Sequence, residues 1–165
     1  CTRKSRVSGI RLLKAGKRSM TLDFEGCLAK NKLVKVRPDK DIALSELQES
    51  QNDLKGAEQD FAQKSWKWAT DKAYYSMFHA ARGLLYLKGY KEQSHICLII
   101  AIKELFVKEG ILPQHYLEFL ASGKLRREDA IYASKYSEEI AKAHIGGAKE
   151  FLKKARELVS SQGHM

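Results

Sequence analysis

The chain has 165 residues, a formal net charge of +10 and only two prolines. A chain of this length forms one domain and buries roughly two-thirds of its unfolded surface, so it needs neither a metal nor a disulfide to hold a core. No apolar run reaches the length of a membrane span, and the N-terminal segment lacks the hydrophobic centre of a signal peptide. These features exclude an integral membrane protein and predict a cytoplasmic one.

The positive charge is concentrated near the N-terminus. Residues 1–40 hold 12 Lys/Arg and 3 Asp/Glu, a net charge of +9, whereas residues 41–165 hold 18 and 17, a net charge of +1. Residues 1–19 contain seven cations and no acid, a pattern typical of an arm that binds nucleic-acid phosphates. Because Met20 reads like a natural start, the alternative is that these residues were added during cloning.

The predicted domain therefore covers residues 20–160, with residues 1–19 as a basic arm or an added segment. Residues 161–165 form a tail in which Gly163-His164-Met165 resembles a cloning scar.

The three cysteines, Cys1, Cys27 and Cys97, show no CxxC or Cys/His ligand spacing, and their odd number argues against a disulfide framework. Cys97 lies in an apolar run and is predicted to be a small core residue. We expect no metal site and no cofactor, in a reducing compartment.

About five helices are predicted, and no segment alternates long enough to require a sheet. Residues 22–36 are expected to form a short helix or a turn at one end of the bundle. Asp39 or Asp41 can cap the first long helix. The apolar seam of that helix advances by steps of four and three, through Ala43, Leu47, Ser50, Leu54, Ala57 and Phe61.

The second long helix is predicted over residues 65–88, with Gly89 as its left-handed C-cap. Ser94 can cap a third helix that ends before Gly110. The predicted buried side of this third helix consists of Ile96, Ile99, Ile100, Lys103, Phe106 and Val107.

Pro113 can open a short fourth helix that ends near residue 122. The last helix, residues 137–159, begins at a capping Ser137 and carries one apolar side. That side consists of Ile140, His144, Gly147, Phe151, Ala155 and Leu158. A Gly146-Gly147 pair inside this helix suggests a close helix contact. Short connections imply antiparallel neighbours, so the expected fold class is all-α, an antiparallel up-and-down bundle.

Tyr75, His79 and Arg82 share one face of the second long helix, because positions i, i+4 and i+7 project together. A phenol, an imidazole and a guanidinium in one row can bind phosphate. The alternative is that His79 and Arg82 satisfy buried partners or line a subunit contact.

Arg126 and Arg127 stand in the polar segment before the last helix, followed by Asp129 and Tyr132. Two consecutive arginines before acids and a tyrosine are uncommon in an ordinary loop. We therefore include this segment among the candidate ligand-binding residues.

Several sequence blocks along the chain match those of one known family: Phe24–Leu28, Ala57 and the acidic turn after it, Lys67–Ala69, Tyr74–Arg82, Gly89 with Ser94–His95, Glu104–Lys108 and Arg127–Tyr132. With these blocks the chain resembles the HEPN-domain proteins of the small prokaryotic branch, from about Met20 to Leu158. The resemblance implies an antiparallel helical bundle that often forms a homodimer with a polar cleft at the interface. It also implies partnership with a minimal nucleotidyltransferase, sometimes as a toxin–antitoxin pair in which the HEPN protein cleaves RNA.

The family's metal-independent ribonucleases use an Arg-x4-6-His motif, in which the histidine transfers protons and the arginine stabilises the phosphorane. In this sequence Arg127 is followed by Tyr132 where the histidine is expected, and His144 lies outside the spacing. A tyrosine, with an unperturbed pKa of about 10, is a poor proton shuttle at neutral pH. His79 can replace the histidine only if the fold brings it to Arg127.

Two functions follow. The first is a dimeric binding and regulatory module that engages a nucleotidyltransferase, a nucleotide or RNA. In that module Arg82, Arg126 and Arg127 contact the ligand, Tyr75 lies beside them, and Asp129 and Tyr132 orient the arginines. The second is a metal-independent endoribonuclease in which Arg127 acts with His79 or His95. The missing motif histidine favours the binding module.

Overall fold

The computed structural model describes residues 22–121 and 136–162. The basic arm, the tail after residue 162 and the candidate residues Arg126, Arg127, Asp129 and Tyr132 lie outside these ranges. The described chain is all-α apart from two short strands, so the predicted helical bundle is confirmed.

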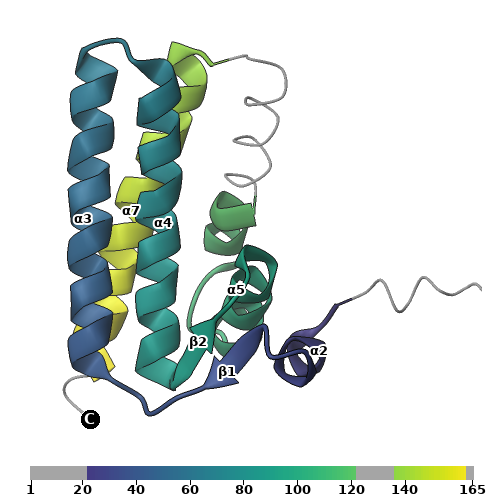
Figure 1. The fold of residues 1–165 in the computed structure, drawn as a ribbon. Helices are drawn as coiled ribbons and strands as arrows, with labels where there is room; N and C mark the ends of the chain where they lie inside the picture. Colours follow the sequence, from purple (N-terminus) through teal and green to yellow (C-terminus); the bar gives the residue numbers. More distant parts are fainter. Residues whose placement is uncertain (1–21, 122–135, 163–165) are drawn as a thin grey trace, which may run out of the picture.

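Three long helices form the body of the molecule: α3 (Lys40–Ala62), α4 (Trp66–Lys88) and α7 (Glu138–Gln162). In Figure 1 they stand side by side, with α7 behind α3 and α4. α3 runs antiparallel to both of the others, whereas α4 and α7 run in the same direction. They can do so because they are not consecutive helices: shorter elements lie between them in the chain.

The smaller elements gather at one end of the bundle. They are α2 (Phe24–Ala29), β1 (Leu33–Lys35), β2 (Tyr90–Glu92), α5 (His95–Ile102) and the π-helix η3 (Lys103–Val107). A helical segment over residues 114–121 follows and lies nearer the middle of the bundle. β1 and β2 pair antiparallel, with Leu33 opposite Glu92. No helix among the described residues is long and apolar enough to cross a membrane.

The predicted helix ends are confirmed at four caps. The Asp39, Ser94 and Ser137 side chains accept hydrogen bonds from the backbone N–H groups of Ile42, Cys97 and Ile140. Gly89 ends α4 in the left-handed region, at φ 87°. A Cβ at Gly89 would lie 2.9 Å from the Val36 carbonyl oxygen, so glycine also allows the close approach of the segment that follows β1.

Small residues let α3 and α4 approach closely. The Ser50 hydroxyl donates to the Ser76 carbonyl at 2.7 Å, and the Ser76 hydroxyl donates to the Ser50 carbonyl at 2.9 Å. Further along α4, a Cβ at Gly83 would lie only 3.1 Å from the Ala43 carbonyl oxygen. The predicted α3 seam is buried from Ala43 to Ala57. This close packing brings the outer edges of the two helices within reach of each other's polar side chains.

The buried side of α5 was predicted wrongly. Ile96 is 52% exposed, and the buried residues are Cys97, Leu98, Ala101 and Ile102, with Phe106 beyond them. Residues 96–102 are apolar on every side, so helical periodicity cannot select the face that packs.

The prediction that no cysteines pair is also wrong. Cys27 and Cys97, both fully buried, form a disulfide that joins α2 to the first turn of α5. An odd cysteine count leaves one thiol over but does not prevent the other two from pairing, and only the packing of α2 on α5 brings these two together.

The glycine pair of α7 does not mark a close helix contact. A Cβ at Gly146 would meet nothing within 4 Å, and one at Gly147 would lie at ordinary van der Waals distance from Phe119 and Met77. The remaining predicted apolar side of α7 packs on the core, with His144, Phe151 and Ala155 buried.

Candidate functional site

Four side chains along α4 are half-buried at positions i, i+4, i+7 and i+11: Tyr75, His79, Arg82 and Tyr86. The rest of the helix around them is buried, including Tyr74, Met77, Phe78 and Leu85. The predicted row therefore forms one exposed edge of a core helix. We call Tyr75, His79 and Arg82, with the acids that contact them, the His79 row.

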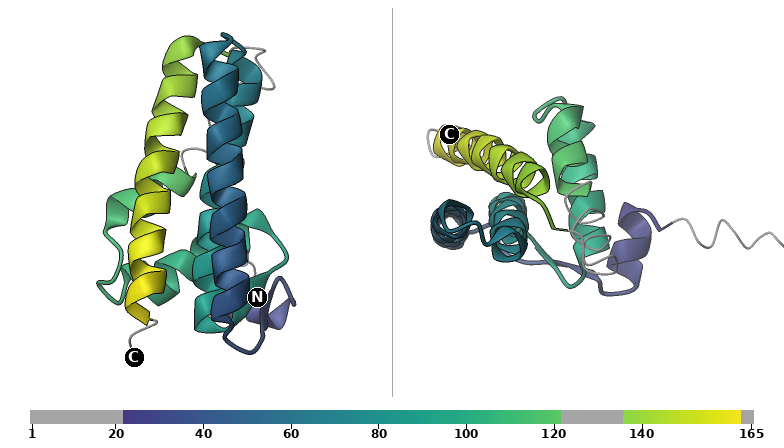
Figure 2. Two further views of the ribbon diagram at one scale, coloured as in Figure 1. Left: turned by 90° about the vertical axis from the view of Figure 1, so that its left-hand side faces the viewer. Right: turned by 90° about the horizontal axis from the view of Figure 1, so that it is seen from above.

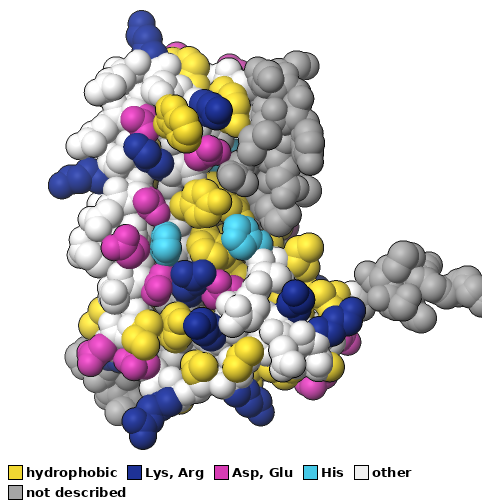
Figure 3. All heavy atoms as spheres, in the orientation of Figure 1, with side chains coloured by type: hydrophobic (Ala, Val, Ile, Leu, Met, Phe, Trp, Pro, Cys, Tyr) yellow, Lys and Arg dark blue, Asp and Glu magenta, His cyan; other side chains and the backbone are white. Residues whose placement is uncertain are grey.

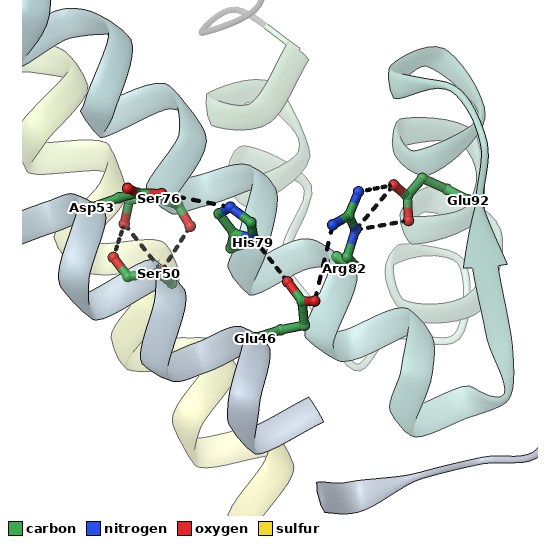
Figure 4. A network of polar contacts seen from close by, with 7 residues as sticks. All are labelled: Glu46, Ser50, Asp53, Ser76, His79, Arg82 and Glu92. Carbon is green, nitrogen blue, oxygen red and sulfur yellow. Dashed lines mark hydrogen bonds and ion pairs between the residues drawn. The ribbon is translucent and has the colours of Figure 1, made fainter. Parts of the chain in front are cut away.

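His79 lies between two carboxylates of α3 (Figure 4). Its Nδ1 atom is 2.8 Å from Glu46 Oε1, and its Nε2 atom is 3.6 Å from Asp53 Oδ2. Glu46 and Asp53 are seven residues apart, two turns of helix, so they lie on the same face of α3 and hold the imidazole from both sides. Both ring nitrogens consequently face an acid.

Arg82 pairs with Glu92 at the end of β2. The guanidinium donates from Nη2 to Glu92 Oε2 at 2.6 Å and from Nε at 3.1 Å, while Nη1 is 3.9 Å from Glu46 Oε2. The Glu92 side chain is only 4% exposed. The Gly89 turn and the β1–β2 pairing place Glu92 there, because they fix the chain directly after α4.

The electrostatics of the row follow from these contacts. The hydrogen bond that His79 donates to the Glu46 carboxylate raises the pKa of His79 above its ordinary 6.5, against the opposing effect of burial. Burial raises the pKa of Asp53 above 3.8, although the charge of His79 opposes this shift. Burial also acts to lower the pKa of Arg82, but the Glu92 hydrogen bond and charge outweigh it and raise that pKa.

The row therefore holds three carboxylates against at most two cations. That balance does not by itself attract phosphate. Among the residues described, no group of three or more His, Cys, Asp or Glu side chains has the arrangement of a metal site.

An aromatic cluster adjoins the row on the side of α5. The His95 ring centroid lies 4.4 Å from that of Phe78, and the guanidinium carbon of Arg82 lies 4.6 Å from the Phe78 centroid. His95 Nδ1 hydrogen-bonds the Tyr74 hydroxyl at 3.0 Å. Tyr75 packs edge-on against Phe78 and His95. Figure 3 shows histidines, acids, cations and apolar side chains gathered near the middle of this face.

The other described histidines lie elsewhere. His144 is buried and its Nδ1 atom is 3.0 Å from the Ile140 carbonyl oxygen, while His115 lies 3.3 Å from Glu150 on another part of the surface. Of the histidines in the described ranges, His79 and His95 are therefore the two near the row.

The sequence patterns indicated Tyr75, His79 and Arg82 but not the acids that hold them. The spacing of Glu46 and Asp53 on one face of α3 was an available signal. No sequence pattern indicated Glu92, because only the turn at Gly89 and the pairing of two short strands bring it to Arg82.

Deprotonation of His79 is expected to destabilise the fold. Because its folded pKa lies above the unfolded value, the stabilisation is fully present below about pH 6.5 and is lost as the pH rises through the folded pKa. We expect the Tm to fall as the pH rises above about 6.5, and His79→Gln to flatten that slope. The raised pKa of Asp53 has the same sign in a more acidic window.

Thermal melts at a series of pH values measure this effect. Glu46→Gln should flatten the slope in the same way, whereas Glu49→Gln, on the exposed side of α3, should keep the parent slope. An unchanged slope in His79→Gln would show that another group carries the pH dependence.

Helical bundles with a polar row at one edge occur in many classes of protein, and comparison with known proteins identifies this one. Residues 45–161, which include most of α3 and nearly all of α7, match the model of the HEPN domain. The match covers more than half of the chain, so the chain belongs to the HEPN family, as its sequence blocks indicated.

Two archaeal proteins are similar to this chain. Putative toxin MJ0605 of Methanocaldococcus jannaschii is 30% identical over 104 residues, which cover 62% of this chain and 78% of that protein. UPF0332 protein PH1297 of Pyrococcus horikoshii is 40% identical over 53 residues, which cover 32% of this chain and 37% of that protein.

Proposed function

We propose that this chain is the HEPN component of a toxin–antitoxin type of pair and that it acts by binding rather than by cleavage. Its partner is a minimal nucleotidyltransferase, and its ligand is a nucleotide or RNA. It works as a homodimer, as the family resemblance implies, and in the cytoplasm, as expected from the sequence. Membership of the HEPN family and the similarity to a protein named as a toxin support the pairing.

The position of His79 between Glu46 and Asp53 is the observation that supports binding rather than cleavage. A histidine that transfers a proton to or from RNA needs one ring nitrogen directed at the substrate. Here Nδ1 and Nε2 both face carboxylates of the chain itself, at 2.8 and 3.6 Å. The raised pKa of His79 also favours the protonated form, which cannot act as a base.

In this proposal Arg126 and Arg127 bind phosphate, because two nitrogens of Arg82 already donate hydrogen bonds to Glu92. A guanidinium binds phosphate bidentately without changing its protonation. In this proposal Arg82 and Tyr75 line the cleft beside the ligand, and Asp129 and Tyr132 orient the two arginines.

The second candidate function, a metal-independent ribonuclease, draws on His95. This imidazole hydrogen-bonds the Tyr74 hydroxyl through Nδ1 and lies on Phe78 beside the row. In that mechanism Arg127 stabilises the phosphorane, while His95 or His79 takes the proton from the attacking 2′-hydroxyl.

The test incubates the purified full chain with RNA in the presence of a chelator and measures both cleavage and binding. We expect binding without cleavage. Arg127→Ala should abolish binding because the bidentate contact is lost, whereas His79→Ala should leave it largely intact. Arg37→Ala, an exposed arginine outside the row, is the matched control and should bind as the parent does.

Cleavage that disappears in both Arg127→Ala and His79→Ala, or in both Arg127→Ala and His95→Ala, would replace the binding proposal with the ribonuclease. Melting each variant first separates loss of ligand contact from loss of fold.

A further inference from the structure

The face between α3 and α7 carries two hollows along one seam. Figure 2, left, looks onto this face, where the two helices lie side by side and antiparallel. One hollow, of about 460 Å³, is lined by Glu58, Phe61, Lys142, Ile145, Gly146 and Lys149. The other, of about 350 Å³, is lined by Leu44, Leu47, Gln48, Arg156 and Ser160. Together they make an interrupted groove along the bundle.

Cations border this groove at heptad spacing. Lys142, Lys149 and Arg156 are seven residues apart, so they follow one side of α7 along the seam. Lys149 pairs with Glu58 across the groove at 2.9 Å. Lys142 and Arg156 are exposed and have no carboxylate partner among the described residues.

The first hollow is mainly apolar, whereas the second mixes leucines with polar side chains. Glycine weakens a helix relative to alanine, yet a Cβ at Gly146 would meet no atom within 4 Å. Packing within the chain therefore does not require this glycine, and its missing side chain keeps the first hollow open beside Phe61 and Ile145. At the second hollow Leu44 is 47% exposed.

We propose that this groove binds an amphipathic helix of a partner protein. Its apolar side chains enter the two hollows, and acidic side chains spaced at multiples of seven pair with Lys142 and Arg156. These two cations are fourteen residues apart, about 21 Å along a helix, so the partner helix needs about four turns. It lies on α3 and α7 as a further helix of the bundle, in the helix-in-groove mode.

An acidic helix fits this face better than a second copy of the chain or a lipid surface. The two hollows lie between antiparallel helices, and Lys142 and Arg156, which have no carboxylate partner among the described residues, line one hollow each and favour acidic side chains in the occupant. The groove also lies apart from the His79 row, which the α3–α4 edge presents on the face of Figure 3. The proposal therefore does not depend on the proposed function.

The test uses two synthetic helical peptides of 21 residues that share leucines at the core positions. One carries glutamate at the flanking heptad positions, and the other carries lysine there. Titration of the full chain should show binding of the glutamate peptide, weakened by added salt. Lys142→Glu with Arg156→Glu should weaken that binding at least tenfold and let the lysine peptide bind instead.

The matched control, Lys91→Glu with Lys103→Glu, makes the same charge change at exposed positions away from the groove and should bind the glutamate peptide normally. Gly146→Phe should fill the first hollow and reduce binding, whereas Gly146→Ala should not. Arg127→Ala, which tests the proposed function, should leave peptide binding unchanged.

Equal binding of both peptides, or equal binding by the parent and the Lys142→Glu/Arg156→Glu variant, would overturn the proposal. Analytical ultracentrifugation can also overturn the proposal. If the parent self-associates and the Lys142→Glu/Arg156→Glu variant does not, the groove binds a second copy of the chain.

Discussion

Arg82→Ala is expected to lower the free energy of unfolding by about 3 kcal/mol, because it leaves the buried Glu92 carboxylate without its cation. Glu92 is only 4% exposed at its side chain and accepts from two nitrogens of Arg82. Removing one partner of a buried ion pair costs more than the pair contributes, since the remaining charge has lost its hydration. The 29% exposure of Arg82 keeps the cost at the lower end of the usual range.

Urea unfolding of Arg82→Ala, Glu92→Gln and the double variant measures this cost. The double variant should recover much of the stability lost in Arg82→Ala, since a neutral amide tolerates burial better than an unpaired carboxylate. Arg82→Lys should fall between the parent and Arg82→Ala, because an ammonium cannot reproduce the forked contact. Additive losses in the double variant would refute coupling between the two side chains.

Arg82→Ala also distinguishes two roles of Arg82, an anchor for β2 and a direct contact to the ligand. If the guanidinium mainly anchors β2 to α4, ligand affinity measured well below the melting temperature should change little. A large loss of affinity in a protein that remains folded would instead make Arg82 a direct ligand contact.

Phe78→Ala is expected to destabilise the fold by about 3–5 kcal/mol. Phe78 is 5% exposed, and its ring contacts the imidazole of His95, at 4.4 Å between centroids, and the guanidinium of Arg82. Truncation would remove core contacts and also the surface on which these two side chains rest. The polar edge and the core of α4 therefore share one aromatic ring.

Denaturant unfolding gives the magnitude, with Trp68→Ala as the matched control. Trp68 is an aromatic residue of the same helix but is 53% exposed, so its loss should change the stability by about 0.5 kcal/mol at most. Similar costs for both variants would contradict the assignment of Phe78 to the core.

These effects bear on how such a module can be disrupted. The His79 row is a structural network as much as a candidate ligand surface, because Glu46, Glu92 and His79 join α3, β2 and α4 (Figure 4). Substitutions in the row are therefore expected to change stability, so a change in binding has to be measured on variants shown to be folded. Arg127 and the α3–α7 groove therefore offer cleaner tests of function than the row does.

The sequence by itself determined the helices, their caps and the edge of α4 that carries Tyr75, His79 and Arg82. These are local properties, because 3.6-residue periodicity, a capping side chain and a glycine at positive φ act within a few residues. The family was also readable from local blocks, the Tyr74–Arg82 segment above all.

Tertiary structure decided what these residues contact. The packed side of α5 could not be read from a stretch that is apolar all round, and the Cys27–Cys97 disulfide depends on where α2 packs. His79 and Glu46 are 33 positions apart in the chain, and they pair because small residues let α3 and α4 approach closely. Long-range packing of this kind determines which charged side chains pair, and the periodicity of the sequence does not predict those pairs.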